Sequence, residues 1–523
     1  MRKFISILIV SSLANLSEAL TILVYLTLVG RSHLDLTSTL INKLTERGHT
    51  VDLIIGRLNS DIPSNGSHSA RNIVAAEFEG KSPWNKLPHI SGPFDVMPSD
   101  KMWIGTSLPT FNRCTTQLCD RVLQNKEIAE HLSTHKYDLA LVSVYDGCPL
   151  ALAHKYGITK VLTFSTLPAT HYEQLSSGLP DLPAYEYDSL HTQRLFDPES
   201  FLHRSLNFIR THYMRIAGEA DFYNSMNSVV RSHYGADFPD VKSLYQKVFY
   251  EFVNANAMLE RPRPTSQRIK FIGGIGFQRG KEVTEQFYVD LLKSSRKGIV
   301  IISFGSQVPA ASIPSNIVEG FLQAAKTFPD HTFLWKYNAK LENATNNLVS
   351  VDWLPQNDLL QSPQVVGFVS HTGLNSFTET LYAGVPVISI PLFADQLHNG
   401  LNVARLGSGI VLKKIGLNGD KITEALRQIL SDDRYRTRAK ELAEMLAMDP
   451  ATPTRTFVET VEFAVQFENI NDITFLPGGR LSTMAHYGYD IVLCLNTLSL
   501  VSLFLLLKTL GRFLSVSEKV KNE

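Results

Sequence analysis

The stretch Val365–Gln396, VVGFVSHTGLNSFTETLYAGVPVISIPLFADQ, contains the pattern that decides the fold. An apolar run of strand length, VVGFVSH, is followed by the helix-like segment GLNSFTETLYAG and by a second apolar run, PVISIPL. A buried strand, a helix and another buried strand in close succession are typical of a parallel sheet covered by helices. Ligands of such sheets lie beyond the carboxyl ends of the strands. The polar residues that follow VVGFVS therefore occupy the position where a ligand is expected.

The same alternation recurs on both sides of this stretch. In the second half of the chain the strand-like runs are KGIVIISFGS (297–306) and HTFLWKY (331–337), with the helix SNIVEGFLQAAKTF between them and the loop LVSVDWLPQNDLL after them. In the first half they are TILVYLTLV, TVDLII, YDLALVSV and KVLTFST. We therefore expect two doubly wound α/β domains facing each other across a cleft, at residues 20–280 and 281–485. The segment ERPRPTSQRIKFIGGIG (260–276) is interpreted as the linker, and residues 176–259 as a helical cover of the first domain.

Both ends of the chain carry targeting signals. Residues 1–19 have a basic start, an apolar run and small residues near Ala19, which indicates a secretory signal peptide rather than a buried first strand. Residues 489–508 include the uncharged run Ile491–Leu507, which spans about 26 Å as a helix and predicts a single-pass transmembrane segment. Basic residues follow it, so the tail, residues 509–523, is expected in the cytosol and the body in the lumen. The ending KVKNE resembles a dilysine retrieval signal and favours the endoplasmic reticulum membrane.

Composition excludes some classes of function. The chain has 523 residues with 50 Lys plus Arg and 50 Asp plus Glu, so no bulk charge favours nucleic acid. After the expected signal peptide, two sequons, at Asn65 and Asn343, fit a luminal body. Outside the apolar segment the cysteines are Cys114, Cys119 and Cys148, which allow at most one disulfide. Cys and His residues lack metal-ligand spacing and the sequence contains no Asp-x-Asp pair, so no metal site is predicted.

The turn after VVGFVS predicts an anion site. His371 and Gly373 lie in the turn, and Asn375 and Ser376 lie in the first turn of the following helix, where unpaired N–H groups and the helix dipole favour an anion. A protonatable imidazole and small polar side chains there suit a diphosphate. Glu379 lies one turn further along the same face and can bind a vicinal diol such as ribose. Anion and diol one turn apart indicate a nucleotide, although a helix cap with ordinary surface residues is the alternative.

Three other loops of the second half add ligand-binding side chains. Gly305 and Ser306 follow another strand and form a second turn suited to phosphate. Trp353 and Gln356 offer a ring for stacking and an amide for a base edge, although Trp is more often a core residue. Asp395 and Gln396 end a further strand with groups that suit sugar hydroxyls.

The stretch Trp353–Gln396 resembles the donor-binding signature of the UDP-glycosyltransferases, and most closely that of the membrane-bound animal branch, the UDP-glucuronosyltransferases. The resemblance extends over nearly the whole chain, including GRSH…L…RGH near the start, the RP linker, the signal peptide, the anchor and the tail. It implies the GT-B arrangement of two facing Rossmann-like domains, with the acceptor on the first and the UDP-sugar on the second.

By this resemblance each donor-site residue acquires a role. Trp353 would stack on uracil and Gln356 would hydrogen-bond it, while Glu379 would bind the ribose. Asp395 and Gln396 would bind the sugar. The residues that would hold the diphosphate are Ser306, His371, Asn375 and Ser376, with Gly373 in the turn. Thr372 departs from the family, which usually has a small residue there, and a β-branched residue disfavours positive φ, so we expect a slightly different turn.

His33 is the expected catalytic base. It follows the first strand at its carboxyl end, it has an ordinary pKa close to neutrality, and it matches the family's catalytic histidine. The family's orienting acid lies where this chain has Ser143, and Asp146 follows three residues later. Three interpretations stay open: Asp146 replaces the acid, His33 works with less help, or the protein is slow or inactive. Asp146 as a loop cap is the structural alternative.

The sequence therefore predicts an inverting, metal-independent transferase that moves glucuronate or glucose from a UDP-sugar to a hydroxyl of a small lipophilic acceptor, as in detoxification. No cofactor is predicted beyond the UDP-glucuronate or UDP-glucose co-substrate. A non-catalytic UDP-sugar-binding or partner subunit, with Ser143 as the degraded acid position, is the alternative, and a UDP-sugar epimerase is a third. The sequence leaves the acceptor and any homo- or hetero-oligomer undetermined.

Overall fold

Seven parallel strands form the first sheet, in the order β3-β2-β1-β4-β5-β6-β7. The computed structural model describes residues 19–63, 66–86, 92–95, 108–167, 177–186, 197–305 and 308–521. The strands are β1 (Thr21–Thr27), β2 (Thr50–Gly56), β3 (Asn72–Ala76), β4 (Leu139–Ser143), β5 (Val161–Ser165), β6 (Glu251–Val253) and β7 (Ile269–Phe271). The order reverses between β1 and β4, and this switch point is where a doubly wound sheet binds its ligand.

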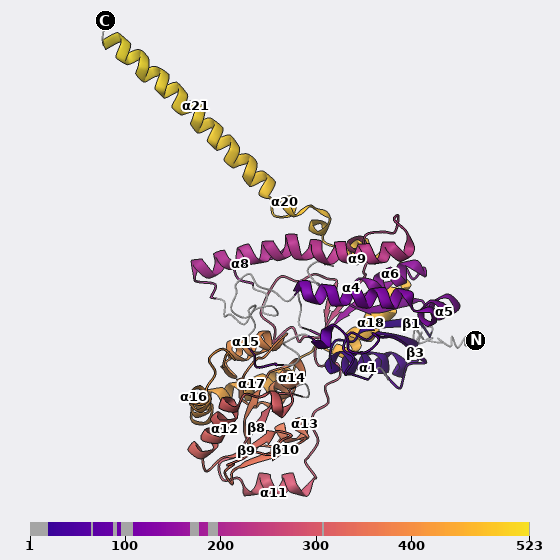
Figure 1. Cartoon of the computed structure of the whole chain (residues 1–523), viewed down its shortest axis with the longest axis vertical. Coiled ribbons are helices and arrows are strands. Elements are labelled where there is room, and N and C mark those ends of the chain that lie inside the picture. Colours follow the sequence, from indigo (N-terminus) through magenta and orange to yellow (C-terminus); the bar gives the residue numbers. More distant parts are fainter. Residues whose placement is uncertain are drawn as a thin grey trace, which may run out of the picture.

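Helices cover both faces of this sheet (Figure 1). They are α1 (Arg31–Glu46), η1 (Trp84–Lys86), α4 (Leu108–Gln124), α5 (Lys126–Thr134), α6 (Cys148–Lys155), α8 (Phe201–Tyr213), η3 (Met214–Gly218), α9 (Glu219–Tyr234) and α10 (Val241–Tyr245). β1 and β4 are almost wholly buried, which explains why both strands are continuous apolar runs in the sequence. Within the region 176–259, α9 and α10 pack into the hydrophobic core on one face of this sheet.

Six parallel strands form the second sheet, in the order β10-β9-β8-β11-β12-β13. They are β8 (Ile299–Ser303), β9 (Thr332–Lys336), β10 (Leu348–Val351), β11 (Val365–Ser370), β12 (Val387–Ser389) and β13 (Gly409–Val411). Its helices are α11 (Gln286–Ser294), η4 (Ala310–Ser312), α12 (Ser315–Thr327), α13 (Gln356–Leu360), α14 (Leu374–Ala383), α15 (Gln396–Leu406), α16 (Gly419–Ser431) and α17 (Asp433–Ala447). Here the switch point lies between β8 and β11, the strand that begins at Val365.

The structure corrects three sequence interpretations. The expected linker contains β7, which pairs with β6 as the last strand of the first sheet, so the chain leaves that sheet only after Phe271. The expected loop 348–360 begins with β10, an edge strand paired with β9, and ends with α13. The expected helical cover 176–259 contains β6, which pairs with β5 and with β7 and is therefore a strand of the first sheet.

After the second sheet is complete, the chain returns to the first (Figure 1). Helix α18 (Pro453–Gln466) packs Phe457 edge-on against Phe252 of β6, with ring centroids 4.9 Å apart. Glu462 of the same helix accepts a hydrogen bond from Arg47 at 2.9 Å. α19 (Ile470–Thr474), η5 (Pro477–Arg480), α20 (Thr483–His486) and α21 (Tyr489–Lys521) follow. The predicted boundary at residue 280 lies between β7 and α11, and the division into domains stays a prediction.

Several contacts join the domains near the carboxyl edge of the second sheet, and two of them show the arrangement. Phe94, from the first domain, is buried in the core of the second, where its ring lies edge-on to Phe304 at 5.3 Å. Phe304 directly follows β8, so the first domain reaches this edge of the second sheet. At the crossing segment, Glu260 pairs with Nε2 of His398 in α15 at 2.6 Å. Both contacts fit the expected facing arrangement.

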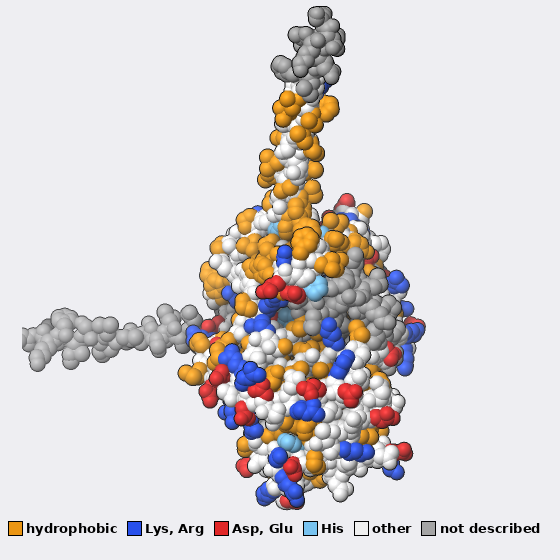
Figure 2. Space-filling model, turned by 90° about the vertical axis from the view of Figure 1, so that its left-hand side faces the viewer, with side chains coloured by type: hydrophobic (Ala, Val, Ile, Leu, Met, Phe, Trp, Pro, Cys, Tyr) orange, Lys and Arg blue, Asp and Glu red, His pale blue; other side chains and the backbone are white. Residues whose placement is uncertain are grey.

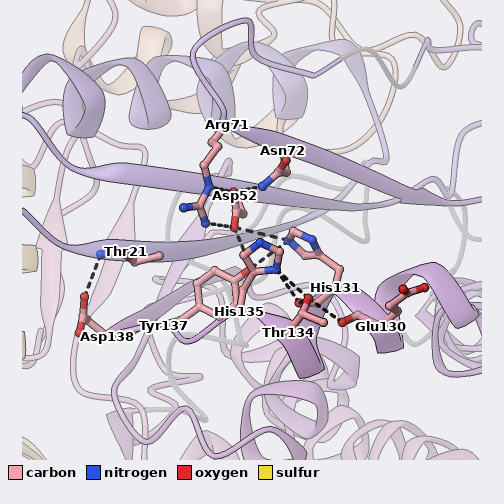
Figure 3. Close-up of polar contacts among 10 residues, drawn as sticks. All are labelled: Thr21, Asp52, Arg71, Asn72, Glu130, His131, Thr134, His135, Tyr137 and Asp138. Carbon is pink, nitrogen blue, oxygen red and sulfur yellow. Dashed lines mark hydrogen bonds and ion pairs between the residues drawn. The ribbon is translucent and has the colours of Figure 1, made fainter.

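A polar cluster around the buried Asp52, at the opposite, amino end of the first sheet, has a structural role (Figure 3). The Asp52 carboxylate accepts hydrogen bonds from the Arg71 guanidinium, from Asn72 at 2.9 Å and from the Tyr137 hydroxyl at 2.8 Å. Burial alone would raise the pKa of Asp52, but these donors hold it below its ordinary value. The cluster ties β2 and β3 to the entrance of β4, and it does not lie at a switch point.

The cysteines and the last helix fit their predictions. Cys119 of α4 and Cys148 of α6 form a disulfide, and Cys114 is buried and free, so one disulfide forms in the body. The 24 residues Tyr489–Arg512 of α21 are long and apolar enough to cross a membrane. The helix projects away from the body (Figure 1). It extends beyond the predicted range 489–508, and residues 1–18 of the expected signal peptide lie outside the described residues.

Candidate active site

The end of β1 is tied to the end of β4 by a network of buried hydroxyl groups. The Thr27 N–H donates to the Ser143 hydroxyl at 2.9 Å, and the two hydroxyl groups lie 2.8 Å apart. The Thr27 hydroxyl also donates to Asp146 Oδ2 at 2.6 Å. Ser143 thus holds the two strand ends together, and Thr27 holds the Asp146 loop at the switch point.

Asp146 is a buried carboxylate with few partners. Its second oxygen accepts a hydrogen bond from the Cys148 N–H at 2.9 Å, in the manner of a helix cap. Burial raises the pKa of Asp146 to about 6, although both hydrogen bonds act in the opposite direction. A carboxylate with so high a pKa is costly to keep ionised, and such groups are frequent in active sites.

His33 lies in the first turn of α1, directly beyond the end of β1. It is buried, and burial lowers the pKa of its imidazole to about 4, so the ring is neutral at pH 7 and can accept a proton. The ring of Tyr145 packs against it with centroids 5.1 Å apart. The Tyr145 hydroxyl is itself fixed by Thr166, 2.6 Å from its Oγ1. Tyr145 was not predicted, and the only sequence signal is its place next to Asp146.

His33 and Asp146 share no hydrogen bond in the part of the chain that the structure describes. Each carboxylate oxygen of Asp146 accepts one hydrogen bond, from the Thr27 hydroxyl and from the Cys148 N–H. The contact between His33 and Tyr145 nevertheless brings the Asp146 loop beside the imidazole. Any effect of Asp146 on His33 therefore acts through the electric field and through Tyr145.

In the second domain, His371 and Gly373 form the turn between β11 and α14. A Cβ on Gly305 or on Gly373 would come within 2.8 Å of the His371 ring, so both positions need glycine. Gly373 caps α14 without a side chain, which leaves the first N–H groups of the helix available to an anion. Burial lowers the pKa of His371 to about 4, so the imidazole offers a hydrogen bond rather than a charge. Ser306, the other predicted phosphate residue, lies outside the described residues.

Thr372 holds the turn in a strained conformation. Its φ is +56°, which is unfavourable for a β-branched residue, and its side chain is buried. Its hydroxyl lies 2.6 Å from that of Ser389 and donates to the Gln396 carbonyl at 3.1 Å. The Thr372 carbonyl accepts from Asn399 at 3.0 Å. These contacts offset the strain and link the turn after β11 to the start of α15.

We expect Thr372→Ala to lower the free energy of unfolding by about 1–3 kcal/mol, because it leaves buried hydrogen-bonding groups unpaired while φ stays positive. Thr372→Ser keeps the hydroxyl and is expected to unfold at nearly the wild-type temperature. Thermal unfolding of the detergent-solubilised protein measures both. Equal melting temperatures for the two variants would contradict this account of the turn.

Trp353 and Gln356 lie close to the first turns of α14. The Trp353 ring is 68% exposed, so it is not a core anchor and can stack on a base. Gln356 donates from Nε2 to the Ser376 hydroxyl at 3.1 Å and to Glu379 at 2.5 Å. Burial raises the pKa of Glu379 above its ordinary value. Gln356, Ser376 and Glu379 thus form one polar cluster, whereas Asn375 is exposed in the first turn.

Lys336 is a cation of this site that sequence reasoning missed. It lies at the end of β9, its Nζ is 4.1 Å from the centroid of the Trp353 ring, and it donates to the Gly305 carbonyl at 3.3 Å. It therefore connects the exposed ring with the turn after β8. The only sequence signal is its position at the carboxyl end of a strand of the second sheet.

Asp395 and Gln396 start α15 and are both buried. The Gln396 amide oxygen accepts the N–H groups of Leu392 at 2.8 Å and Phe393 at 3.1 Å, so only its amide nitrogen is left for a sugar. Asn399 donates to Asp395 at 2.7 Å, and burial raises the pKa of Asp395 to about 6. Asn399, which also holds the Thr372 carbonyl, is a second residue that the sequence did not indicate.

Both switch points thus carry polar groups suited to a nucleotide-sugar reaction, and a comparison with known families agrees. The family model described as "UDP-glucoronosyl and UDP-glucosyl transferase" matches residues 23–510. The chain belongs to this family of UDP-glycosyltransferases. It is therefore a glycosyltransferase that uses a UDP-sugar, as the sequence predicts.

Relatives of this UDP-glycosyltransferase differ in the sugar that their names specify. It is 27% identical to the 2-hydroxyacylsphingosine 1-beta-galactosyltransferase of Mus musculus, over 98% of this chain and 91% of the relative. It is 26% identical to UDP-glucuronosyltransferase 1A8 of Rattus norvegicus, over 75% of this chain and 72% of the relative. The predicted animal branch is thereby confirmed, while identities near this level leave the sugar and the acceptor open.

Solved structures confirm the predicted GT-B fold. The glycotransferase of kitacinnamycin matches 86% of this chain and 99% of its own with a TM-score of 0.59 at 17% identity. A UDP-glucosyltransferase from Polygonum tinctorium matches 86% and 99% with a TM-score of 0.54 at 16% identity. At such identities the likeness concerns the fold alone.

Proposed function

We propose that this UDP-glycosyltransferase moves a glucuronosyl or glucosyl unit from a UDP-sugar to a hydroxyl of a small lipophilic acceptor, with inversion and without a metal ion. The observation that carries the proposal is the position of the candidate groups at the two switch points: His33 after β1, and the turn around His371 after β11. The sequence has no Asp-x-Asp pair to hold a metal-bound diphosphate.

In the proposed reaction His33 removes the proton from the acceptor hydroxyl as its oxygen attacks the anomeric carbon. The bond between that carbon and the diphosphate oxygen breaks, and UDP leaves with the electron pair. Two features support this role for His33: the neutral imidazole can take up a proton, and the packed Tyr145 ring fixes its orientation. Asp146 would stabilise the imidazolium that forms, provided that its carboxyl group is ionised.

On the donor side we propose the roles that the family resemblance implies. Trp353 stacks on uracil, Gln356 hydrogen-bonds the base and Glu379 binds the ribose. The sugar is bound by Asp395 and the amide nitrogen of Gln396. The diphosphate is held by His371, Asn375, Ser376 and the N–H groups after Gly373, together with Ser306. We add Lys336 to this set, because it lies between the Trp353 ring and the Gly305 carbonyl.

We further propose that α21 anchors the protein in the endoplasmic reticulum membrane, with the body in the lumen and residues 509–523 in the cytosol. The exposed apolar helix and the basic residues after it support this orientation. An anchor keeps the site near a membrane in which lipophilic acceptors dissolve, as a detoxifying transferase requires. The name of the Mus musculus relative specifies a lipophilic acceptor, 2-hydroxyacylsphingosine. The two relatives' names together specify two different sugars.

Trp353→Ala tests the donor site, because loss of stacking on a base costs about 1–3 kcal/mol and should raise the Kd for UDP by about 5- to 150-fold. Trp353→Phe keeps an aromatic face and should lose much less affinity. Isothermal titration of the solubilised protein with UDP measures both variants. Unchanged UDP affinity in Trp353→Ala would contradict the assignment of this ring to uracil.

A second candidate function is a UDP-sugar-binding or partner subunit without turnover. Ser143 at the acid position favours it, and so does the lack of a hydrogen bond between His33 and Asp146 among the described residues. Such a subunit would bind UDP in the titration above and release none from a UDP-sugar in the presence of acceptors.

A further inference from the structure

The outer side of α8 and η3 is apolar. Leu202, Ile209 and Tyr213 lie seven and four residues apart, which places them on one face of the helix. The exposed large apolar residues of this segment, called the α8 face below, are Phe201, Leu202, Phe208, Ile209, Tyr213 and Ile216. Phe201 is 77% exposed and Ile216 is 62% exposed. So large a continuous apolar surface is unusual for a protein face in water.

The burial pattern of α8 is the reverse of that of an ordinary surface helix. Its buried residues are polar: Asn207 and Arg210. Asn207 donates from Nδ2 to the Pro183 carbonyl at 2.8 Å and to the Glu186 carbonyl at 2.6 Å, which fixes the polar side against the body. The apolar side is therefore directed outward by hydrogen bonds of the helix itself.

The α8 face adjoins the base of the apolar helix α21. The Tyr487 hydroxyl donates to Asp181 at 2.9 Å, and Arg215 of η3 donates to the same carboxylate at 2.8 Å. Tyr489, the first residue of α21, contacts His212 of α8 through its hydroxyl. Figure 2 shows hydrophobic side chains gathered on the end of the body from which α21 rises. In Figure 1 α8 crosses this same end of the body.

The α8 face carries no acidic side chain, since residues 201–218 contain neither Asp nor Glu. Two of the three arginines of this segment are held by the body: Arg210 is buried and Arg215 pairs with Asp181. An amphipathic helix whose apolar face is free of acidic groups can lie in the interfacial layer of a bilayer, where its apolar side chains reach about 5–10 Å into the headgroup and acyl boundary. The first residues of α21 lie against α8, so a membrane crossed by α21 lies next to the α8 face. A bilayer is therefore a better occupant of this face than a water-soluble partner protein.

We propose that the α8 face lies in the interfacial layer of the same bilayer that α21 crosses. The body is then held against the membrane at two places, by the spanning helix and by α8 beside it, rather than swinging on a single anchor. The inference rests on the proposed role of α21 as a membrane anchor, and it is independent of the transferase chemistry.

Site-specific fluorescence in vesicles tests this proposal on the full chain. A polarity-sensitive NBD label is attached to one cysteine at a time in protein reconstituted into phosphatidylcholine vesicles that carry nitroxide lipids. In the body Cys119 and Cys148 are disulfide-bonded and Cys114 is buried, so Cys494 of α21 serves as the native label site. In a Cys494→Ser background the test positions are Ile209→Cys and, as a second site on the face, Leu202→Cys. Met448→Cys, at a residue 82% exposed after α17, is the matched control.

We expect the labels at 202 and 209 to shift their emission to the blue and to be quenched by nitroxides near the headgroups, while the label at 448 keeps a water-like, unquenched emission. Water-like emission at 202 and 209 with quenching at 494 would overturn the proposal and leave the anchor intact. A blue shift without lipid quenching would show that a protein or a second copy covers the face, and would also overturn it. Absence of quenching at 494 would refute the anchor, and this inference with it.

Discussion

His33→Ala is expected to lower kcat by about 10²–10⁴-fold while leaving the Kd for UDP unchanged. The reason is that the substitution removes the base that takes the acceptor proton, whereas the donor groups lie on the other domain. Acceptor-dependent UDP release by microsomes measures kcat, and titration with UDP measures donor binding. The loss should affect every acceptor, because each one must lose the same kind of proton.

His154→Ala is the matched control, because this histidine is exposed near the end of α6 in the same domain. It should keep the wild-type rate. A His33→Ala variant that folds, binds UDP and still turns over within about threefold of wild type would be inconsistent with a base at this position.

Asp146→Asn is expected to lower kcat/KM at neutral pH by about 30-fold. If the imidazolium and the Asp146 carboxylate lie about 8 Å apart in the transition state, their attraction is worth about 2 kcal/mol at an effective dielectric constant near 20, and the substitution removes it. The amide has the same size as the carboxyl group. Its oxygen can accept from the Cys148 N–H while its NH2 group donates to the Thr27 hydroxyl, so this variant should fold.

The pH profile separates a catalytic role of Asp146 from a structural one. The pKa of Asp146 is raised to about 6, so its carboxylate is lost as the pH falls through that value, whereas His33, with a pKa of about 4, stays neutral there. Wild-type kcat/KM should therefore fall below pH 6. In Asp146→Asn this step should disappear, and the remaining activity should stay level until the pH approaches 4. An acid limb near pH 4 in both proteins would reduce Asp146 to a loop cap.

The sequence predicts the parts of this molecule that depend on local pattern. Runs such as VVGFVS are buried strands because both faces of a parallel sheet are covered, so their apolar character is visible without a structure. Ligand groups follow strand ends, and the strand-end pattern therefore located His33 and the turn around His371. Thr372 departs from the small residue that the family usually has in this turn, and the sequence therefore predicts a different turn. Hydrogen bonds of its hydroxyl group with Ser389 and with the Gln396 carbonyl offset its positive φ.

What the sequence missed depends on contacts between distant residues. β7 was hidden in a segment rich in Pro and Arg, and its strand character comes from pairing with β6. Tyr145 and Lys336 belong to the site only because packing brings them to His33 and to the Trp353 ring. The return of α18 to the first sheet rests on Phe457 meeting Phe252, more than two hundred residues earlier, and no local pattern indicates it.

The inverted burial of α8 could not be predicted for the same reason. The periodicity of a helix shows that it has an apolar face, but not which face packs on the body. Here the hydrogen bonds from Asn207 to the carbonyl groups of Pro183 and Glu186 decide the orientation.

The most direct test of the central claim is acceptor-dependent release of UDP by microsomes containing the wild-type protein. UDP-glucuronate, UDP-glucose and UDP-galactose would be offered with a panel of phenols, and UDP binding would be measured on the same preparation. We predict UDP release that requires an acceptor and that favours one of the first two donors. Measurable UDP binding without release from any donor would contradict the transferase and support the non-catalytic subunit.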